Sequence, residues 1–407
     1  MIRFINIVVC YLILVGGVCL IYPWEEASAA KLELIKTVEI GKNRELLVNN
    51  RPFFPIMSWA QSTCTFGRLK GLGFNTFCGS GKSAGEALES AVTVGGYAIP
   101  HFSHFAPALK GHPGALAWAL QDEPDLGIGK GQPRVAPEQV ANWYRKSKEQ
   151  DPTRPVFLNY TSWFMKYESG DKPDVKAYYS MTSKAADILS FDIYPIYQLN
   201  RDDKLTLVAD GVSQLLEYAG PGKPVWAWIE TSKGSRWITY EKQKDVTPAI
   251  TRSEVWMAII RGATGIGYFT HAWRPRFTEF APTPEMQMEL KRTNMQLARL
   301  CPIILSGPSN TKASIAFQGG LYGEIMVREH NGYVYFFANN LDMNDVGEAK
   351  DDVKAVYRGG IATITADGLK DGSRVEVVDE DRSIVVVGHK FSDKFDPLEV
   401  HIYRYKK

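Results

Sequence analysis

The stretch AWALQDEPDL, from Ala117 to Leu126, begins as an apolar run and ends on three carboxylates. A short apolar run of this kind is typical of a strand that is buried on both faces of a parallel sheet. The three acids, Asp122, Glu123 and Asp125, follow where that strand should end. The first two would lie at one edge of the sheet, whereas Asp125, past the proline, is expected to be a loop residue. Whether this edge is a functional site depends on how the other strands end.

Strand-like runs alternate with helical patterns across residues 52–305, which predicts a parallel sheet. With the opening stretch as the fourth, the runs cover 52–59, 74–80, 97–102, 115–124, 156–163, 188–196, 224–232 and 265–273. Eight strand–helix units over about 250 residues predict a (β/α)8 TIM barrel. A doubly wound open sheet is the alternative, but no G-x-G-x-x-G follows an early strand, and the repeat reaches eight.

Several helices between these strands carry boundary signals. The helical patterns after the first and third strands are weak. Pro137 is a typical first-turn residue, and Gly220 is a plausible C-cap. Thr251 followed by Glu254 has the spacing of a capping box, which predicts that a helix begins at Thr251.

Beyond residue 305 the pattern changes to an alternation of apolar and polar residues, which is typical of antiparallel strands. Asn331-Gly332 predicts a tight hairpin turn. We therefore expect an antiparallel β-sandwich over 306–407, with a short β lead-in over 30–51 before the barrel.

Residues 1–29 have the pattern of a secretory signal peptide. Arg3 precedes the apolar run from Ile5 to Tyr22, and Ala27-Ser28-Ala29 is an A-x-A cleavage site. We expect a mature chain exported to the periplasm, cell surface or extracellular space, with no membrane contact after cleavage. An uncleaved anchor is the alternative, because the run is nearly long enough to span a bilayer.

Charge, cysteine number and histidine spacing argue against a nucleic acid partner, a disulfide framework and a metal site. A net charge of +2 without a basic run gives no sign of nucleic acid binding. Three cysteines lie outside the signal, too few for a disulfide framework, so Cys64, Cys78 and Cys301 are expected to be buried free thiols. His101 and His104 suggest a metal pair, but no further ligand lies at helix or strand spacing. A metal-dependent hydrolase built on His101, His104 and Asp192 is kept as a less favoured alternative. We expect a monomer without metal or cofactor.

The strand ends hold the candidate site, because active sites of (β/α)8 barrels lie at the C-terminal ends of the strands. The fourth strand ends on Glu123, and the seventh, VWAWIETS, ends on Glu230. Two glutamates three strands apart suit glycoside hydrolysis, in which one acid protonates the leaving oxygen and the other attacks the anomeric carbon. The other strand ends provide candidate substrate-binding residues, namely Asp122, Tyr194, His271, Trp273, Trp59, Asn159, Asp192, His101 and Trp228.

This pattern resembles the clan A glycoside hydrolases, whose barrels carry an acid/base Glu after strand four and a nucleophile Glu after strand seven. The matching motifs are ALQDEPD and VWAWIETS, with Tyr194 in FDIYP and Trp273 in THAW at two further clan positions. The resemblance implies a retaining enzyme that acts on a β-linked poly- or oligosaccharide, with Glu123 as acid/base and Glu230 as nucleophile.

One residue departs from the clan pattern. The clan usually has Asn directly before the acid/base Glu, where this chain has Asp122. A carboxylate there adds negative charge beside Glu123, which would raise the pKa of that acid. The departure leaves open a barrel that binds carbohydrate without cleaving it.

Overall fold

The computed structural model describes residues 32–343 and 354–407. The predicted signal peptide lies outside the described residues. Within them, no helix combines the length and the apolar character needed to cross a bilayer.

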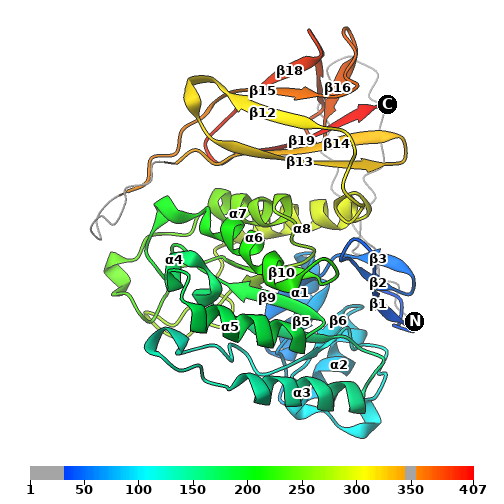
Figure 1. The fold of residues 1–407 in the computed structure, drawn as a ribbon, viewed down its shortest axis with the longest axis vertical. Coiled ribbons are helices and arrows are strands. Elements are labelled where there is room, and N and C mark those ends of the chain that lie inside the picture. The colour runs from blue at the N-terminus through cyan, green and yellow to red at the C-terminus, as the bar shows by residue number, and fades with distance from the viewer. Residues whose placement is uncertain (1–31, 344–353) are drawn as a thin grey trace, which may run out of the picture.

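Eight parallel strands form the predicted barrel (Figure 1). Hydrogen-bonded ladders connect β7 through β11 in chain order, and β11 pairs with β4, which continues to β5 and β6. Two isolated bridges, Ala98 with Ala115 and His101 with Ala119, close the ring between β6 and β7. The strands are β4 (Ile56–Trp59), β5 (Thr76–Cys78), β6 (Tyr97–Ile99), β7 (Trp118–Ala119), β8 (Val156–Tyr160), β9 (Ile188–Asp192), β10 (Val225–Glu230) and β11 (Ile266–Phe269).

Helices surround the barrel, and two of the predicted boundaries are confirmed. Pro137 is the first residue of α3, and Gly220, with a φ of 70°, ends α6. After β6 the chain forms only short 3-10 turns at Phe102–His104 and Pro107–Leu109, where the sequence pattern is weak. The helices are α1 (Phe66–Gly71), α2 (Ala84–Thr93), α3 (Pro137–Gln150), α4 (Lys166–Ser169), α5 (Pro173–Thr182), α6 (Leu207–Ala219), α7 (Pro248–Ile260) and α8 (Pro284–Ile304).

The predicted start of α7 at Thr251 is wrong. The helix begins at Pro248, and Thr247 is its N-cap, whose side chain accepts a hydrogen bond from the Ile250 amide. Thr251 lies inside the helix and donates from its hydroxyl to the carbonyl of Glu230, at 2.9 Å. Glu254 is fully buried. The two residues of the supposed capping box thus belong to the contact between α7 and β10.

The barrel interior is filled by large side chains that point inward from alternate positions. Trp226 and Trp228 on β10 are both buried in this inner core. Gly265, just before β11, and Gly267 on β11 provide the space for them, because a β-carbon on Gly267 would lie 2.1 Å from the Trp228 ring. A three-stranded sheet, β1 (Val38–Ile40), β2 (Leu46–Val48) and β3 (Arg51–Phe53), packs against the same core, near the first residue of β6.

The C-terminal strands form the predicted β-sandwich, which lies over α6, α7 and α8 in Figure 1. The Asn331-Gly332 hairpin is confirmed, with both residues at positive φ. Trp256 of α7 stacks on Phe337 of β14 at a ring-centroid distance of 5.7 Å, joining barrel and sandwich. One sheet has β12 (Ala313–Phe317), β15 (Gly360–Ala366) and β18 (Lys390–Phe395); the other has β13 (Gly323–His330), β14 (Tyr333–Asn340), β19 (Val400–Lys406), β16 (Arg374–Val377) and β17 (Arg382–Val385).

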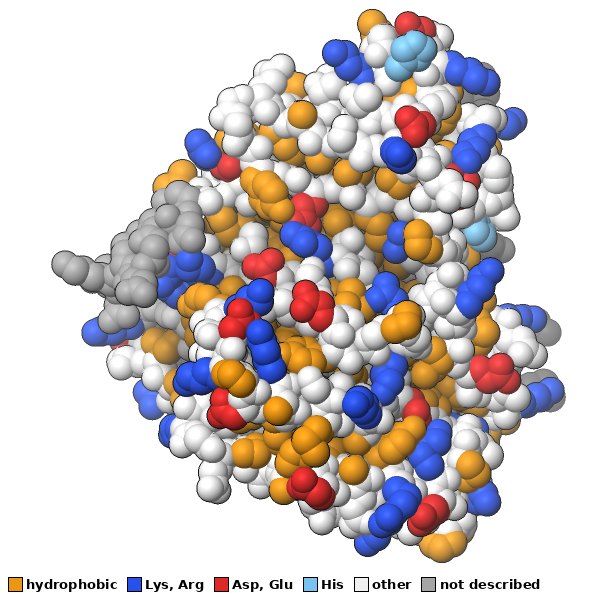
Figure 2. Space-filling model, viewed as in Figure 1, with side chains coloured by type: hydrophobic (Ala, Val, Ile, Leu, Met, Phe, Trp, Pro, Cys, Tyr) orange, Lys and Arg blue, Asp and Glu red, His pale blue; other side chains and the backbone are white. Residues whose placement is uncertain are grey.

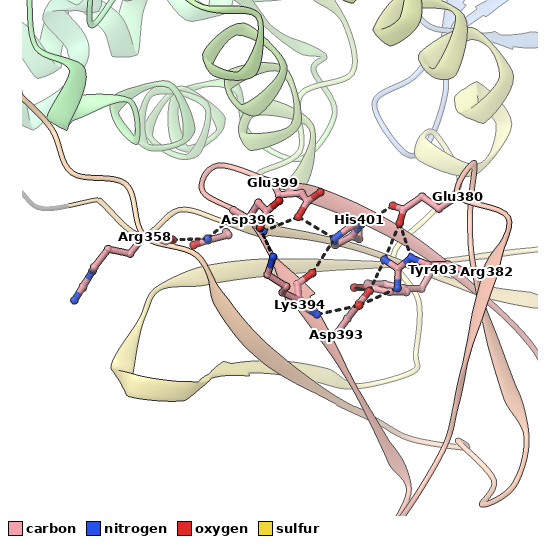
Figure 3. A network of polar contacts seen from close by, with 10 residues as sticks. Arg358, Glu380, Arg382, Asp393, Lys394, Asp396, Glu399, His401 and Tyr403 are labelled. Atoms are coloured by element: carbon pink, nitrogen blue, oxygen red, sulfur yellow. Dashed lines mark hydrogen bonds and ion pairs between the residues drawn. The ribbon is translucent and has the colours of Figure 1, made fainter.

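A polar network crosses the side of the sandwich that lies nearest to the barrel helices (Figure 3). His401 is 4% exposed and lies between two carboxylates, with Glu380 at 2.5 Å from Nδ1 and Glu399 at 3.3 Å from Nε2. Arg382 connects Glu380 to Asp393 by ion pairs. On the face shown in Figure 2, acidic and basic side chains are interspersed.

Candidate active site

Three polar strand ends meet at the mouth of the barrel. Asn159, near the end of β8, donates from its side-chain amide to Asp122 at 3.0 Å and to Asp192 at 3.1 Å. Ser190 of β9 donates to the Asn159 carbonyl oxygen at 2.6 Å, which fixes the amide's orientation. The predicted residues Asp122, Asn159 and Asp192 are therefore brought together, with Asn159 as the bridge between two carboxyl groups.

Glu123 lies beside this bridge in a strained backbone conformation. Its φ is 47°, a left-handed value that is uncommon for residues other than glycine and is frequent at functional sites. The Glu123 amide donates to the Asn159 carbonyl at 3.1 Å, so the turn is anchored to β8. The Glu123 side chain is 25% exposed, and Arg134 approaches its carboxylate at 4.0 Å. Glu123 is thus held in place and open to the mouth.

Electrostatics at the mouth favour protonated carboxyl groups. Burial, followed by the charges of Asp122 and Asp125, raises the pKa of Glu123 to about 7, against the opposing effects of Arg134 and a hydrogen bond with Asp192. Burial raises the pKa of Asp122 to about 6. Burial and the Glu123 charge raise the pKa of Asp192 well above its ordinary value. The cluster therefore retains protons near neutral pH and can supply one to a bound molecule.

Glu230 lies at the end of β10 in a different environment. Its two carboxyl oxygens accept hydrogen bonds from the amides of Ile196, at 2.9 Å, and Tyr197, at 2.5 Å. These amides begin the turn that follows β9, so Glu230 caps that turn from the neighbouring strand. Burial raises the pKa of Glu230 to about 7, while the two amides and Glu254 favour its ionised form.

Glu230 is only 1% exposed, and two aromatic rings lie near it. Tyr194, just past β9, and Phe269, at the end of β11, stack on each other with centroids 5.1 Å apart. Phe269 is the register partner of Glu230 on β11, and the Glu230 charge is among the causes that raise the pKa of Tyr194 after burial, so the ring pair lies next to the buried Glu230. The structure thus brings Glu123 together with Asp122, Asn159 and Asp192, whereas Glu230 contacts the β9 loop and α7.

The predicted aromatic and histidine residues divide into two groups. Trp59 packs edge-on against Trp228 at 5.2 Å and against His101 at 6.1 Å, and Trp228 donates to Ser190 at 3.1 Å. These three residues form a cluster at the floor and wall of the mouth.

The second group comes from the end of β11. His271 is 5% exposed, packs against Phe269 and lies 3.5 Å from the Gln61 amide. Burial lowers the pKa of His271, which favours the neutral ring. Trp273 is 40% exposed, with the Arg236 guanidinium over its ring at 5.2 Å. His271 is therefore largely enclosed, whereas Trp273 presents a ring at the rim.

A cavity of about 490 Å³ opens beside the acidic cluster. Asp122 and His101 line it together with Arg134 and Trp143, which the sequence did not single out. Arg134 follows Glu123 by eleven residues in a loop, a position that no periodic pattern marks. The remaining lining residues are Phe102, Ser103, Leu120 and Gln121.

Metal ligation finds no support in the part of the chain that the structure describes. There, no group of three or more His, Cys, Asp or Glu is placed to hold a metal ion. The rings of His101 and His104 are 6.2 Å apart. All three described cysteines are free, and Cys78 is buried as expected, but Cys64 is exposed and Cys301 is partly exposed. The expectation of buried thiols is therefore wrong for Cys64.

Comparison with known proteins adds to the description of the fold. No protein-family model and no curated protein matches the chain. An α-amylase structure from Geobacillus thermoleovorans, solved with acarbose, aligns with a TM-score of 0.55 at 10% identity, covering 91% of this chain and 100% of that one. The structure of a glycoside hydrolase aligns with a TM-score of 0.53 at 12% identity, covering 91% of this chain and 97% of that one.

The fold is that of barrel glycoside hydrolases. An Anoxybacillus α-amylase gives the same result, with a TM-score of 0.50 at 10% identity over 90% of this chain and 99% of that one. The alignments extend across nearly the whole of both chains, so they include the β-domain as well as the barrel. At these identities the likeness shows the fold alone. The activity has to be argued from the residues at the mouth.

Proposed function

We propose that the protein is a glycoside hydrolase that cleaves β-linked poly- or oligosaccharides with retention of configuration. The observation that carries the proposal is Glu123, an accessible carboxyl group at the mouth of the barrel whose pKa is raised to about 7. An acid that keeps its proton near neutral pH suits protonation of a glycosidic oxygen. The strained backbone at Glu123 is consistent with a residue held for function.

Glu230 is the nucleophile in this proposal. An ionised carboxylate has about four acceptor positions, and the amides of Ile196 and Tyr197 occupy two of them. These donors favour the ionised form and hold the group in one orientation. Because Glu230 is 1% exposed, attack on the anomeric carbon requires the side chains that enclose it to move when the sugar enters.

The reaction then proceeds in two displacements. Glu123 gives its proton to the glycosidic oxygen while a Glu230 oxygen bonds to the anomeric carbon and the aglycone leaves. Glu123, now ionised, takes a proton from water, whose oxygen displaces Glu230 from that carbon. Trp59 and Trp273 offer flat faces on which sugar rings can stack, and Asp122 and Asn159 offer hydrogen-bonding groups beside the acid. Residues 1–29 direct the chain to export in this proposal, and the mature enzyme acts as a monomer without cofactor.

Isosteric variants test the assignment on a panel of aryl β-glycosides and polysaccharides. We expect Glu230→Gln to lower turnover by at least about 10³-fold and Glu123→Gln to lower it by about 10²–10⁴-fold on substrates with poor leaving groups. Azide should restore activity to Glu123→Ala on an activated aryl glycoside. Glu138→Gln, on the exposed first turn of α3, is the matched control. Full activity of Glu230→Gln would refute the assignment.

A carbohydrate-binding barrel without catalysis is the second candidate, because Glu230 is enclosed in the structure. In that case, wild type and Glu230→Gln bind the same oligosaccharide with equal Kd in calorimetry. Neither protein then releases product during prolonged incubation. If wild type releases product and Glu230→Gln does not, this candidate is excluded.

A further inference from the structure

Glu254 is a buried acid that the proposed reaction does not yet use. It lies in the middle of α7 and is 0% exposed. Neither of its carboxyl oxygens finds a conventional hydrogen-bond donor among the described residues. A buried ionised carboxylate without a partner is very costly, so such a group is expected to be neutral or to share a proton.

The group that Glu254 faces is the Glu230 carboxyl. Thr251, one turn earlier on the same face of α7, donates to the Glu230 carbonyl at 2.9 Å and fixes the helix against the end of β10. The Glu254 and Glu230 carboxyl groups lie within hydrogen-bonding reach of each other. Burial and the Glu230 charge raise the pKa of Glu254 well above its ordinary value.

The other charged or titratable groups near this pair are few. One is Tyr357, the pKa of whose hydroxyl is raised by burial first and then by the charges of Asp202, Glu254 and Glu230. That hydroxyl donates to the Asp202 carbonyl at 2.8 Å, so it does not serve as the donor to Glu254. The Asp202 and Asp203 carboxylates, whose charges also act on Tyr357, are paired with Lys244 and Arg201 respectively. Among the described residues, no basic side chain pairs with Glu254, so none is placed to neutralise a second negative charge beside Glu230.

We propose that Glu254 is a positioning residue, a protonated carboxylic acid that donates a hydrogen bond to the carboxylate of Glu230 and holds it ionised for attack. This inference rests on the proposed function, in which Glu230 is the nucleophile. With the Ile196 and Tyr197 amides, Glu254 becomes the third donor to Glu230. One acceptor position of the carboxylate then remains for the anomeric carbon.

Two substitutions separate this role from simple packing. Glu254→Gln keeps a donor of the same shape but cannot ionise, whereas Glu254→Leu removes the donor. We expect Glu254→Leu to lower kcat about tenfold with KM within twofold of wild type. The acid limb of its kcat/KM profile should move to higher pH, because Glu230 loses a donor that favours its charge. Glu254→Gln should recover most of the turnover, with an acid limb close to that of wild type.

The same variants can overturn the proposal. If Glu254 were ionised in wild type, Glu254→Gln would move the acid limb to lower pH, because a neighbouring negative charge would be gone. If Glu254→Leu and the control Glu217→Leu, on exposed α6 surface, both leave kcat and the pH profile unchanged, the role is structural only. Either of these two outcomes refutes the role of Glu254. If Glu230→Gln is nevertheless inactive, the proposed function stands.

A spectroscopic measurement covers the case in which Glu254→Leu fails to fold. The infrared difference spectrum of wild type against Glu254→Gln near neutral pH should contain a buried protonated carboxyl C=O band that the variant lacks. A difference spectrum with only carboxylate bands would overturn the proposal without any measurement of activity.

Discussion

At the residue scale, the decisive contrast is between two glutamates that end equivalent strands. Glu123 is partly open and lies among carboxyl groups, so burial and like charge both favour its protonated form. Glu230 is enclosed, but its two amide donors favour the ionised form against burial. Because the pKa of each is raised to about 7, the proposed division into proton donor and nucleophile rests on exposure and hydrogen-bond donors and not on pKa.

The pH dependence of activity should reflect both groups. The proposed reaction requires Glu230 ionised and Glu123 protonated, and the pKa of each is raised to about 7. We expect a narrow bell-shaped kcat/KM profile with its maximum near pH 7. The two limbs give apparent pKa values that belong to the interacting carboxyl groups together. A broad plateau from pH 5 to 9 would contradict these assignments.

Arg134 should set the position of the alkaline limb. Its charge lowers the pKa of Glu123 against the effects of burial and neighbouring acids. Arg134→Met should therefore move the alkaline limb of kcat/KM to higher pH and leave the acid limb in place. Arg145→Met, on the exposed surface of α3, is the matched control. A stationary or lowered alkaline limb would show that Arg134 does not act on the general acid.

Asp125, expected from the sequence to be a loop residue, is a buried anchor. It is 0% exposed and accepts hydrogen bonds from the Thr161 amide and hydroxyl and from the Tyr179 hydroxyl. Asp125→Ala leaves these donors buried without an acceptor and should lower the free energy of unfolding by about 3 kcal/mol, measured by urea titration. Tyr179→Phe, which removes one donor and keeps the acceptor, should cost about 1 kcal/mol. Equal stability of Asp125→Ala and wild type would contradict the anchoring role.

At the element scale, periodicity predicted every barrel strand, because strands buried on both faces are short apolar runs bounded by turns. The two helices with weak sequence patterns follow the first and third strands. The first is the short α1, and in place of the second the chain forms only 3-10 turns after β6. The α7 boundary failed for a physical reason. Thr247-Pro248 starts the helix, while Thr251 and Glu254 are buried against β10, and a spacing of three residues alone cannot distinguish a cap from one face of a helix.

The cap of α7 can be tested directly. Thr247→Ala removes the acceptor of the Ile250 amide and should lower the free energy of unfolding by about 1 kcal/mol. The far-ultraviolet circular dichroism spectrum of the folded variant should be unchanged. Thr239→Ala, at the start of the preceding 3-10 turn with no side-chain cap bond, is a control that should change stability little. An equal loss of unfolding free energy in Thr247→Ala and Thr239→Ala would argue against Thr247 as the cap.

At the scale of the whole molecule, the sequence predicted the barrel, the sandwich and the candidate strand ends, because each depends on local pattern. It did not indicate that Tyr194 and Phe269 meet across β10, that Arg134 reaches back to Glu123, or that Glu254 lies beside Glu230. These contacts join segments from different strands, loops and helices, and only the closed ring brings them together.

The sandwich should become less stable at alkaline pH. Burial alone would lower the pKa of His401, but hydrogen bonds and ion pairs with Glu399 and Glu380 raise it above the ordinary value. A raised folded-state pKa gives stability that is fully present below the unfolded value, about 6.5, and is lost as pH rises through the folded value. The free energy of unfolding of wild type relative to His401→Gln should therefore fall as pH rises above about 6.5, measured by urea titration. A difference independent of pH would contradict a charged His401.

The most direct test of the proposed chemistry is to trap the glycosyl enzyme. A 2-deoxy-2-fluoro β-glycosyl fluoride of a sugar that the enzyme cleaves slows both displacements and allows the covalent intermediate to accumulate. Mass spectrometry of the digested protein should place the added sugar on Glu230, and Glu230→Gln should carry none. Rapid turnover-dependent labelling of Asp192 or another acid at the mouth, or hydrolysis of aryl glycosides with inverted configuration and no labelled peptide, would contradict the assignment of Glu230 as nucleophile.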